Sequence, residues 1–281
     1  MFAEYEMSLY EFNNKFIQYF GDGDYFSDIL NYSIAEGKRI RPIILIETYQ
    51  MLSSSKPDDS IYNFAIALEL IHNYSLIHDD LPAMDNDDYR RGRLTLHKKF
   101  SEDMAILAGD ALLNTAYEIL LTEISQVEYG ESCKLFNISK AAYCIAYYAG
   151  IKGMIGGQVM DVLESSSSLD DIVKLYKGKT CGLIMAATTS AAYLANCDKQ
   201  TIKDMNDLGF AIGMAFQLQD DLLDIDEDRL INKKTYATYS SEKTVKDRII
   251  EYSDQAIGIL SKYENNNFLV SLTNSLIKRD Y

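Results

Sequence analysis

Apolar residues recur along most of this chain at the three- and four-residue spacing of one helical face. In the segment around residue 70, for example, Phe64, Leu68 and Ile71 share a face, and this period predicts helix rather than strand. Several such segments are apolar around most of their circumference, which is typical of central helices in a large bundle. The sequence has no runs that alternate in the way of a half-buried strand. The pattern therefore predicts an all-α fold, a helical bundle.

Short clusters of turn-forming residues separate the periodic segments. They lie at residues 21–24, 53–60, 82–92, 130 and 165–168. None of them divides the chain into self-contained domains, so we expect a single helical domain over residues 1–281. The sequence has only 3 prolines and 15 glycines, fewer than ordinary usage, and this scarcity favours long uninterrupted helices.

The composition is acidic, with 27 Lys and Arg against 42 Asp and Glu and a formal net charge of −15. Such a surface repels phosphate backbones, which argues against general nucleic-acid binding. The N-terminal residues MFAEYEMSLY lack the basic and apolar regions of a signal peptide. The uncharged run Thr180–Cys197 carries several hydroxyl residues, so we interpret it as a buried core helix rather than a membrane span. We therefore expect a cytoplasmic protein without stable membrane insertion.

Two of the apolar helices end in a pair of aspartates that is followed by a third. The first segment is LIHDDLPAMD (76–85) and the second is QLQDDLLD (217–224). In the second, Asp220 and Asp224 lie four residues apart on one helical face, where their like charges repel each other. A solvated acidic face would explain a single motif of this kind in so acidic a chain. The residues upstream are core-like, however, so we expect both acidic ends to line a cavity.

The chemistry of these ends is that of a magnesium site. Mg²⁺ usually takes one or two carboxylates and completes its octahedron with water and phosphate oxygens. Two acidic clusters therefore predict a diphosphate between them. The basic runs KRIR (38–41) and RRGR (90–93) fit this expectation because arginine forks match phosphate oxygens, although each run on its own is equally well explained as a solvated face.

Other polar and aromatic features carry less weight. The segment KGKT (177–180) is not a P-loop, because it lacks the first glycine of that motif and no strand precedes it. Lys179 and Thr180 remain candidates for the same cavity. We expect His78 and His97 to be structural and the stripe of Tyr143, Tyr147 and Tyr148 to belong to the core.

Six segments resemble, in the right order, the successive motifs of the polyprenyl synthase family, and within it of the bacterial farnesyl diphosphate synthases. They are GKRIRP (37–42), LELIHNYSLIHDDLPAMDNDDYRRGRLTLHKKF (68–100), AILAGDALL (105–113), GMIGGQVMD (153–161), KTCGLI (179–184) and GFAIGMAFQLQDDLLDI (209–225). The resemblance implies the isoprenoid synthase fold, an all-helical bundle around a deep cavity, and a homodimer. It also implies head-to-tail condensation of isopentenyl diphosphate onto an allylic diphosphate.

The resemblance implies residue roles position by position. Both aspartate-rich motifs would hold three Mg²⁺ ions, for which Mn²⁺ can substitute, on the allylic diphosphate. The catalytic acids would be Asp79, Asp80, Asp85, Asp220, Asp221 and Asp224, all of them metal ligands except Asp221, with Asp79, Asp85 and Asp220 foremost. Further residues implied at the allylic diphosphate and the carbocation are Arg90, Lys179, Thr180 and Gln217. Those implied at the isopentenyl diphosphate are Lys38, Arg41, His72 and Arg91.

One segment departs from the family pattern. Bacterial members follow the second motif with one lysine and, about ten residues later, a GKxTYP block. Here DEDRLINKKTYA (226–237) is too short to hold both. Either Lys234, at the ungapped position of the first lysine, or Lys233, before Thr235 and Tyr236, has to contact the diphosphate.

Product length is expected to depend on Tyr74 and its neighbour Ser75. Tyr74 precedes Asp79 by five residues, so at about 1.5 Å per residue its ring lies roughly 7.5 Å below the head group. In bacterial relatives an aromatic residue there, together with the two extra residues of DDLPAMD, goes with a farnesyl product, and we expect farnesyl diphosphate. Geranylgeranyl diphosphate is the alternative product.

Two readings from other classes are weaker. A class I terpene cyclase would have no use for the site formed by Lys38, Arg41 and His72. A non-catalytic partner subunit should have lost motif residues that this chain retains.

Overall fold

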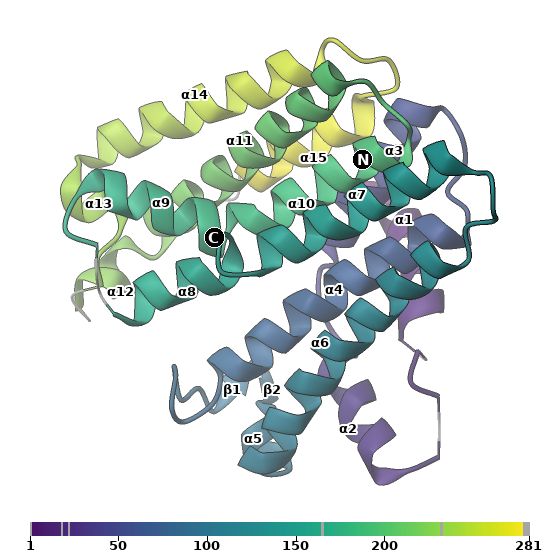
Figure 1. Ribbon diagram of the computed structural model, residues 1–281. Helices are drawn as coiled ribbons and strands as arrows, with labels where there is room; N and C mark the ends of the chain where they lie inside the picture. Colours follow the sequence, from purple (N-terminus) through teal and green to yellow (C-terminus); the bar gives the residue numbers. More distant parts are fainter. Residues whose placement is uncertain (1, 18, 22, 164–165, 231–232, 278–281) are drawn as a thin grey trace. The chain divides into compact units, whose positions relative to one another are not determined.

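The structure is a computed structural model that describes residues 2–17, 19–21, 23–163, 166–230 and 233–277. These residues are helical almost throughout, which confirms the all-α prediction (Figure 1). The chain forms two compact units. The N-terminal unit consists of residues 2–46 and 57–135, and the C-terminal unit of residues 47–56 and 136–281.

In the N-terminal unit the long helices α4 (Asp59–Asp79) and α6 (Glu102–Ser125) pack against each other. Asp58 caps α4 by accepting a hydrogen bond from the N–H of Ile61. The helix is buried over most of its length, as its nearly continuous apolar sequence predicts. The other elements are α1 (Phe2–Phe16), α2 (Tyr25–Ile34), the start of α3 (Ile40–Ser53), β1 (Tyr89–Arg90), β2 (Arg93–Leu94) and α5 (Leu96–Lys99).

In the C-terminal unit α11 (Lys199–Leu223) packs against both α10 (Cys181–Leu194) and α14 (Glu242–Leu260). Residues 181–192 of α10 are all buried, which confirms the prediction of a core helix for the uncharged run. The unit also contains most of α7 (Ser132–Ala149), together with α8 (Met154–Val162), α9 (Leu169–Lys179), α12 (Ile225–Leu230), α13 (Tyr236–Tyr239) and α15 (Asn267–Ile277).

In the part of the chain that the structure describes, one helix, α6, is long and apolar enough to cross a membrane, by length and composition only. Its most apolar window has a mean hydropathy of 1.3 and is 39% buried in the structure. The helix packs along α4 within the N-terminal unit. Because core helices of this kind pass the same test, its composition is weak support for a membrane span.

The predicted aromatic core stripe on α7 is wrong for two of its three residues. The side chains of Tyr143 and Tyr147 are largely exposed, at 63% and 42%. Their rings lie 6.0 Å apart and contact each other on the helix surface, as residues four apart can. Only Tyr148 turns inward, where its hydroxyl accepts a hydrogen bond from Asn206.

Candidate active site

The first acidic cluster forms where α4 ends. Asp79 is the last residue of the helix and Asp80 is its C-cap. The following turn brings Asp85 back, so that its N–H donates to the carbonyl of Asp79 at 2.9 Å. The C-terminal end of a helix carries partial negative charge, so three carboxylates placed there are repelled by one another and by the helix. The cluster therefore requires cations.

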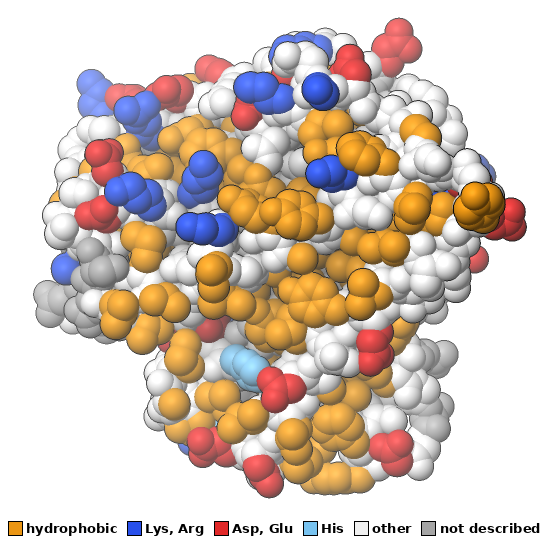
Figure 2. Space-filling model, viewed as in Figure 1, with side chains coloured by type: hydrophobic (Ala, Val, Ile, Leu, Met, Phe, Trp, Pro, Cys, Tyr) orange, Lys and Arg blue, Asp and Glu red, His pale blue; other side chains and the backbone are white. Residues whose placement is uncertain are grey.

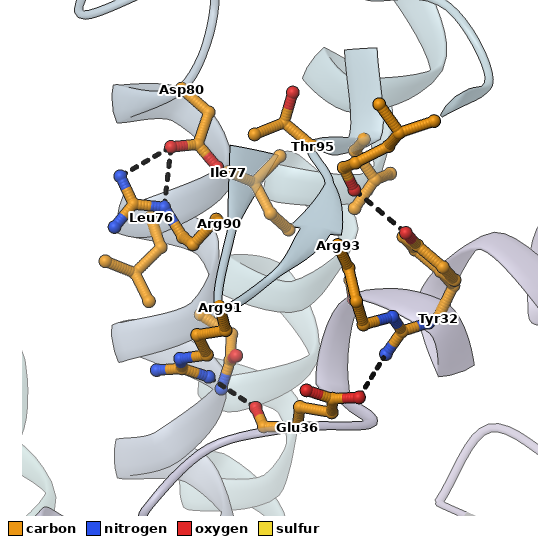
Figure 3. A pocket seen from close by; sticks show the side chains of 13 residues that line it. Tyr32, Glu36, Leu76, Ile77, Asp80, Arg90, Arg91, Arg93 and Thr95 are labelled. Carbon is orange, nitrogen blue, oxygen red and sulfur yellow. Dashed lines mark hydrogen bonds and ion pairs between the residues drawn. The ribbon is translucent and has the colours of Figure 1, made fainter. Parts of the chain in front are cut away.

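Arg90 supplies one of these cations. Its Nε donates to Oδ1 of Asp80 at 2.6 Å, and its Nη2 lies 2.5 Å from the same oxygen (Figure 3). Burial raises the pKa of the Asp80 carboxyl, and the hydrogen bond and charge of Arg90 act in the opposite direction. Asp80 is thus a buried carboxylate with a guanidinium partner inside the protein.

A tight hairpin aims the neighbouring arginines in different directions. β1 and β2 pair as an antiparallel two-stranded sheet with Arg90 opposite Arg93. The two residues of the turn, Arg91 and Gly92, both have positive φ, 53° and 76°, as a two-residue hairpin turn of the primed type requires. Arg90 consequently reaches Asp80, whereas Arg91 reaches the carbonyl of Glu36 (Figure 3).

Asp80 and the arginines of the hairpin line a small pocket of about 70 Å³ in the N-terminal unit (Figure 3). A volume of this size holds a few water molecules. It is suited to a small polar group and not to an isoprenyl chain.

The residues predicted to bind isopentenyl diphosphate gather around the connection between α2 and α3. Arg41 Nη1 lies 3.4 Å from Nε2 of His72, and Lys38 is exposed on the same connection. Burial lowers the pKa of His72 well below its usual value, and the nearby arginines, Arg41 first and Arg91 next, lower it further. The ring is therefore neutral near pH 7 and sits in a positive field, which favours an anionic ligand.

A buried ion pair that the sequence analysis did not single out supports this group. Arg39 Nη1 donates to Oε1 of Glu69 at 3.0 Å, and the two side chains are 1% and 2% exposed. Arg39 also donates to the carbonyls of Ile34 and Glu36 and to Oδ1 of Asn13. The pair ties the connection before α3 to α4, one turn before His72. The signal that could have found it is a glutamate in the middle of an otherwise apolar helix.

Tyr74 is buried on α4, with 6% of its surface exposed. Its ring meets His78 edge to face at 5.8 Å between centroids. Its hydroxyl has no hydrogen-bond partner among the described residues, and burial is the main cause that raises its pKa to about 12. Ser75 donates to the carbonyl of His72 at 2.9 Å and is a local helix contact.

The second acidic cluster forms where α11 ends. Asp224 is its C-cap, is exposed, and donates its N–H to the carbonyl of Asp220 at 3.0 Å. Asp220 is partly buried and Asp221 is buried. The same electrostatic argument holds here, because three carboxylates again lie at the negative end of a long helix.

The polar residues expected beside the carbocation are hydrogen-bonded to one another in the C-terminal unit. Thr180, at the junction of α9 and α10, donates its hydroxyl to Oε1 of Gln217 at 2.6 Å. Gln217 in turn donates from Nε2 to Oδ1 of Asp221 at 3.0 Å. The side-chain amide of Gln217 is therefore held from both ends.

Lys179 forms an ion pair with Asp161, the last residue of the GMIGGQVMD segment. The backbone of α8 approaches closely there, since a Cβ on Gly157 would lie 2.3 Å from the nitrogen of Lys179. Asp161 was not predicted as a site residue, although it stands in a quoted motif. Lys233 and Lys234 are exposed between α12 and α13.

Among the described residues, no three His, Cys, Asp or Glu side chains lie close enough together to hold one metal ion by themselves. Mg²⁺ bound to a diphosphate needs only one or two protein carboxylates, because water and phosphate oxygens complete its shell. The carboxylates at the negative end of α4, with exposed Asp85 among them, offer such a partial donor set, and those at the negative end of α11, with exposed Asp224, offer another. The residues therefore fit this use of magnesium.

Comparison with known proteins shows the family of the chain. Residues 24–245 match the family described as Polyprenyl synthetase. The chain belongs to this family. It is 37% identical over 271 residues to the farnesyl diphosphate synthase of Micrococcus luteus, covering 90% of this chain and 89% of that protein. It is 41% identical over 212 residues to the geranylgeranyl diphosphate synthase of Cyanophora paradoxa, covering 73% and 67%.

A solved structure extends the likeness to the fold of the polyprenyl synthetase family. An FPP/GFPP synthase from Zymomonas mobilis superposes with a TM-score of 0.87 at 29% identity, covering 98% of this chain and 100% of that one. The chain thus has the all-α fold of isoprenyl synthases. It is an enzyme of prenyl transfer in isoprene biosynthesis.

Proposed function

We propose that this enzyme condenses isopentenyl diphosphate with dimethylallyl diphosphate and then with geranyl diphosphate, and releases farnesyl diphosphate. In each round the C–O bond to the allylic diphosphate breaks and a C–C bond forms to the terminal carbon of the isopentenyl double bond. One proton leaves, and pyrophosphate is the second product. The observation that carries the proposal is the pairing of Asp80 with Arg90 at the end of α4, together with neutral His72 beside Arg41 two turns earlier.

The allylic diphosphate is proposed to bind the two acidic clusters. Asp79, Asp85, Asp220 and Asp224 would hold the magnesium ions, with Asp80 engaged by Arg90. Bound magnesium supplies positive charge that stabilises the diphosphate as a leaving group. Arg90 and Lys179 add fixed positive charge that also stabilises the leaving diphosphate. Either Lys233 or Lys234 adds a further contact to the same diphosphate.

The isopentenyl diphosphate is proposed to bind Lys38, Arg41, Arg91 and His72. Neutral His72 donates or accepts one hydrogen bond without adding charge, while the three cations match the diphosphate. Holding the double bond beside the allylic carbon supplies much of the rate advantage. Thr180 and Gln217 offer oxygen dipoles to the developing cation, and the departing pyrophosphate takes the proton. No protein nucleophile is required.

The direct test is incubation of the purified protein with Mg²⁺, isopentenyl diphosphate and dimethylallyl diphosphate, followed by chromatography of the dephosphorylated products. Farnesol as the main product supports the proposal. Geranylgeraniol as the main product would support the alternative, a geranylgeranyl diphosphate synthase, which the likeness to the Cyanophora enzyme favours. A cyclic hydrocarbon, or no product, would contradict both.

Product length provides a sharper test at Tyr74. The buried ring beside His78 is proposed to act as a floor, because close-packed walls yield little to a longer chain. Tyr74→Ala should shift the product from fifteen carbons to twenty or more while the condensation rate is largely kept. Tyr62→Ala, which removes another buried tyrosine earlier on α4, is the matched control. A variant Tyr74→Ala that still stops at fifteen carbons would place the floor elsewhere.

We also propose a homodimer in the cytoplasm. Apolar side chains on the outer surface of α6 support the dimer, among them Ile106, Leu107 and Leu121 at 41%, 50% and 63% exposure (Figure 2). An exposed apolar helix face of this kind is a common sign of an association surface. Light scattering on the purified protein checks the expected mass, and Leu121→Lys should favour the monomer.

A further inference from the structure

The carboxylate of Asp221 is occupied by hydrogen-bond donors of the protein itself. The residue is 3% exposed. Its Oδ2 accepts from the hydroxyl of Tyr176 at 2.5 Å and from the N–H of Tyr236 at 3.2 Å, and its Oδ1 accepts from Gln217 at 3.0 Å. A carboxylate accepts about four hydrogen bonds. Three of these positions are thus filled, from α9, from α11 and from the first residue of α13.

Tyr236 is fastened at this point in two ways. Its N–H lies 3.1 Å from the hydroxyl of Tyr176 as well as near Asp221. Its ring is 3% exposed and packs in a core cluster with Ile172 and Leu218. The start of α13 is therefore held to α11 by both backbone and side chain.

The two candidate lysines immediately precede this anchor. Thr235 donates its N–H to the hydroxyl of Thr238 at 2.9 Å, and that hydroxyl lies 3.3 Å from the carbonyl of Lys233. Lys233 and Lys234 themselves are exposed. The short turn from Lys233 to Thr238 therefore depends on the position of Tyr236, and Tyr236 depends on Asp221.

We propose that Asp221 is a positioning residue, which acts through Tyr176 and Tyr236 to hold Lys233 and Lys234 beside the end of α11. This rests on the proposed function, in which one of these lysines contacts the allylic diphosphate. A lysine on an already ordered turn loses less conformational freedom on binding than one on a loose turn. In this way the shortened segment after the second aspartate motif keeps a lysine in place.

The competing reading is that Asp221 binds metal. A metal ion would have to reach the remaining acceptor position of this buried carboxylate or displace one of its protein donors, and a displaced hydroxyl or N–H would then need a new partner in a buried place. The two readings differ in the role of the Tyr176 hydroxyl. It is essential if Asp221 anchors Tyr236, and it is not needed if Asp221 binds metal.

The decisive variant is Tyr176→Phe, which removes one hydroxyl. Its matched control is Tyr263→Phe. The hydroxyl of Tyr263 donates at 3.0 Å to Asp204, a buried aspartate near the start of α11, the helix that also carries Asp221. Both variants are digested as full-length protein with a small amount of trypsin, and cleavage after Lys233 or Lys234 is followed by mass spectrometry. Cleavage after Lys140 on α7 is the internal reference.

We expect Tyr176→Phe to speed cleavage after Lys233 or Lys234 by on the order of tenfold, the size of a hydrogen bond to a charged group. Cleavage after Lys140 should not change, and Tyr263→Phe should behave as the wild type at both places. Unchanged cleavage after Lys233 and Lys234 in Tyr176→Phe would overturn the anchor. Should this variant fail to fold, Asp221→Asn carries the same test. The NH₂ of an asparagine cannot accept a hydrogen bond, so at least one of the three groups that donate to Asp221 loses its acceptor.

Steady-state kinetics then separate positioning from a purely structural role. Tyr176→Phe should raise KM for the allylic diphosphate several-fold, with KM for isopentenyl diphosphate and the Mg²⁺ midpoint of activation unchanged. Faster cleavage with an unchanged allylic KM would overturn the positioning role. A shifted Mg²⁺ midpoint with unchanged cleavage would favour the metal reading. If no condensation occurs at all, the proposed function fails, and the trypsin experiment still decides the anchor.

Discussion

The two acidic clusters have the same plan and different internal partners. In each Asp-Asp pair the second aspartate is the buried one, with Asp80 at 4% and Asp221 at 3% exposure. Asp80 meets a guanidinium, that of Arg90, whereas Asp221 accepts hydrogen bonds from the neutral groups of Tyr176, Gln217 and the Tyr236 backbone. Hydrogen bonds from neutral groups satisfy a carboxylate but do not cancel its charge. Arg90 thus balances part of the negative charge at the end of α4, whereas the neutral donors to Asp221 leave its charge to be balanced by other cations.

The largest effect is expected when either cluster loses its first aspartate. Asp79→Ala and Asp220→Ala should each lower kcat by roughly a hundredfold to a thousandfold. Each variant loses a carboxylate that would hold the magnesium, and with it the positive charge that stabilises the leaving group. The unfolding temperature should change little. The exposed Asp247→Ala on α14 is the control. Near-normal turnover in one of the two variants would show that its cluster is not part of the reaction.

The buried pair of Arg39 and Glu69 in the N-terminal unit joins two full charges, whereas the donors described at Asp221 are neutral. Glu69→Gln leaves the guanidinium of Arg39 without its charged partner, and breaking such a pair costs about 3–5 kcal/mol. Replacing both residues by methionine should cost less, because no buried charge remains. Chemical denaturation of the single and double variants measures this. A double variant as unstable as the single one would contradict the electrostatic cause.

The difference between the surroundings of Asp80 and Asp221 marks what a sequence can and cannot show. The positions of the aspartates at helix ends follow from the apolar period and from the motif, and so does the basic group around Arg41. Which acid is turned inward does not, because Asp79 and Asp80, or Asp220 and Asp221, are chemically identical neighbours. Burial decides between them, and burial depends on partners such as Tyr176 and Arg90, one of them far away in the sequence.

The same reasoning explains the errors on the surface. Tyr143 and Tyr147 have the spacing of a core stripe, yet they are exposed, because period alone gives a face and not what covers it. The ion pair of Arg39 with Glu69 was missed for the opposite reason. Its two members lie in segments whose meeting only the folded chain reveals.

One lysine of each unit is expected to serve a different substrate. Lys38→Ala in the N-terminal unit should raise KM for isopentenyl diphosphate about tenfold, and Lys179→Ala in the C-terminal unit should do so for the allylic substrate, as expected for a lost charge-assisted bond. Lys177→Ala is the control, since it lies on the same helix as Lys179 and is exposed. A Lys38 variant that weakens only allylic binding would show that the two subsites are exchanged.

The smallest expected effect is a pH dependence of stability that comes from His72, in the N-terminal unit. The pKa of His72 is lowered well below 6.5 by burial and by the charges of Arg41, Arg91, Arg39 and Arg90. The unfolded chain then binds more protons below pH 6.5 than the folded one does. Stability must therefore rise with pH in this range, by up to about 1.4 kcal/mol per pH unit for one group.

This contribution is fully present above pH 6.5 and is lost as the pH falls toward the lowered pKa of the folded state. His72→Gln, which does not titrate, should lose less stability between pH 7 and pH 5 than the wild type, as measured by urea unfolding. Inorganic pyrophosphate should raise the pKa of His72, seen by NMR titration of the imidazole, because its negative charge offsets the arginines. An equal loss of stability in wild type and variant would mean that the positive field does not control this ring, and the contrast with the cluster on α11 would then rest on Asp80 and Arg90 alone.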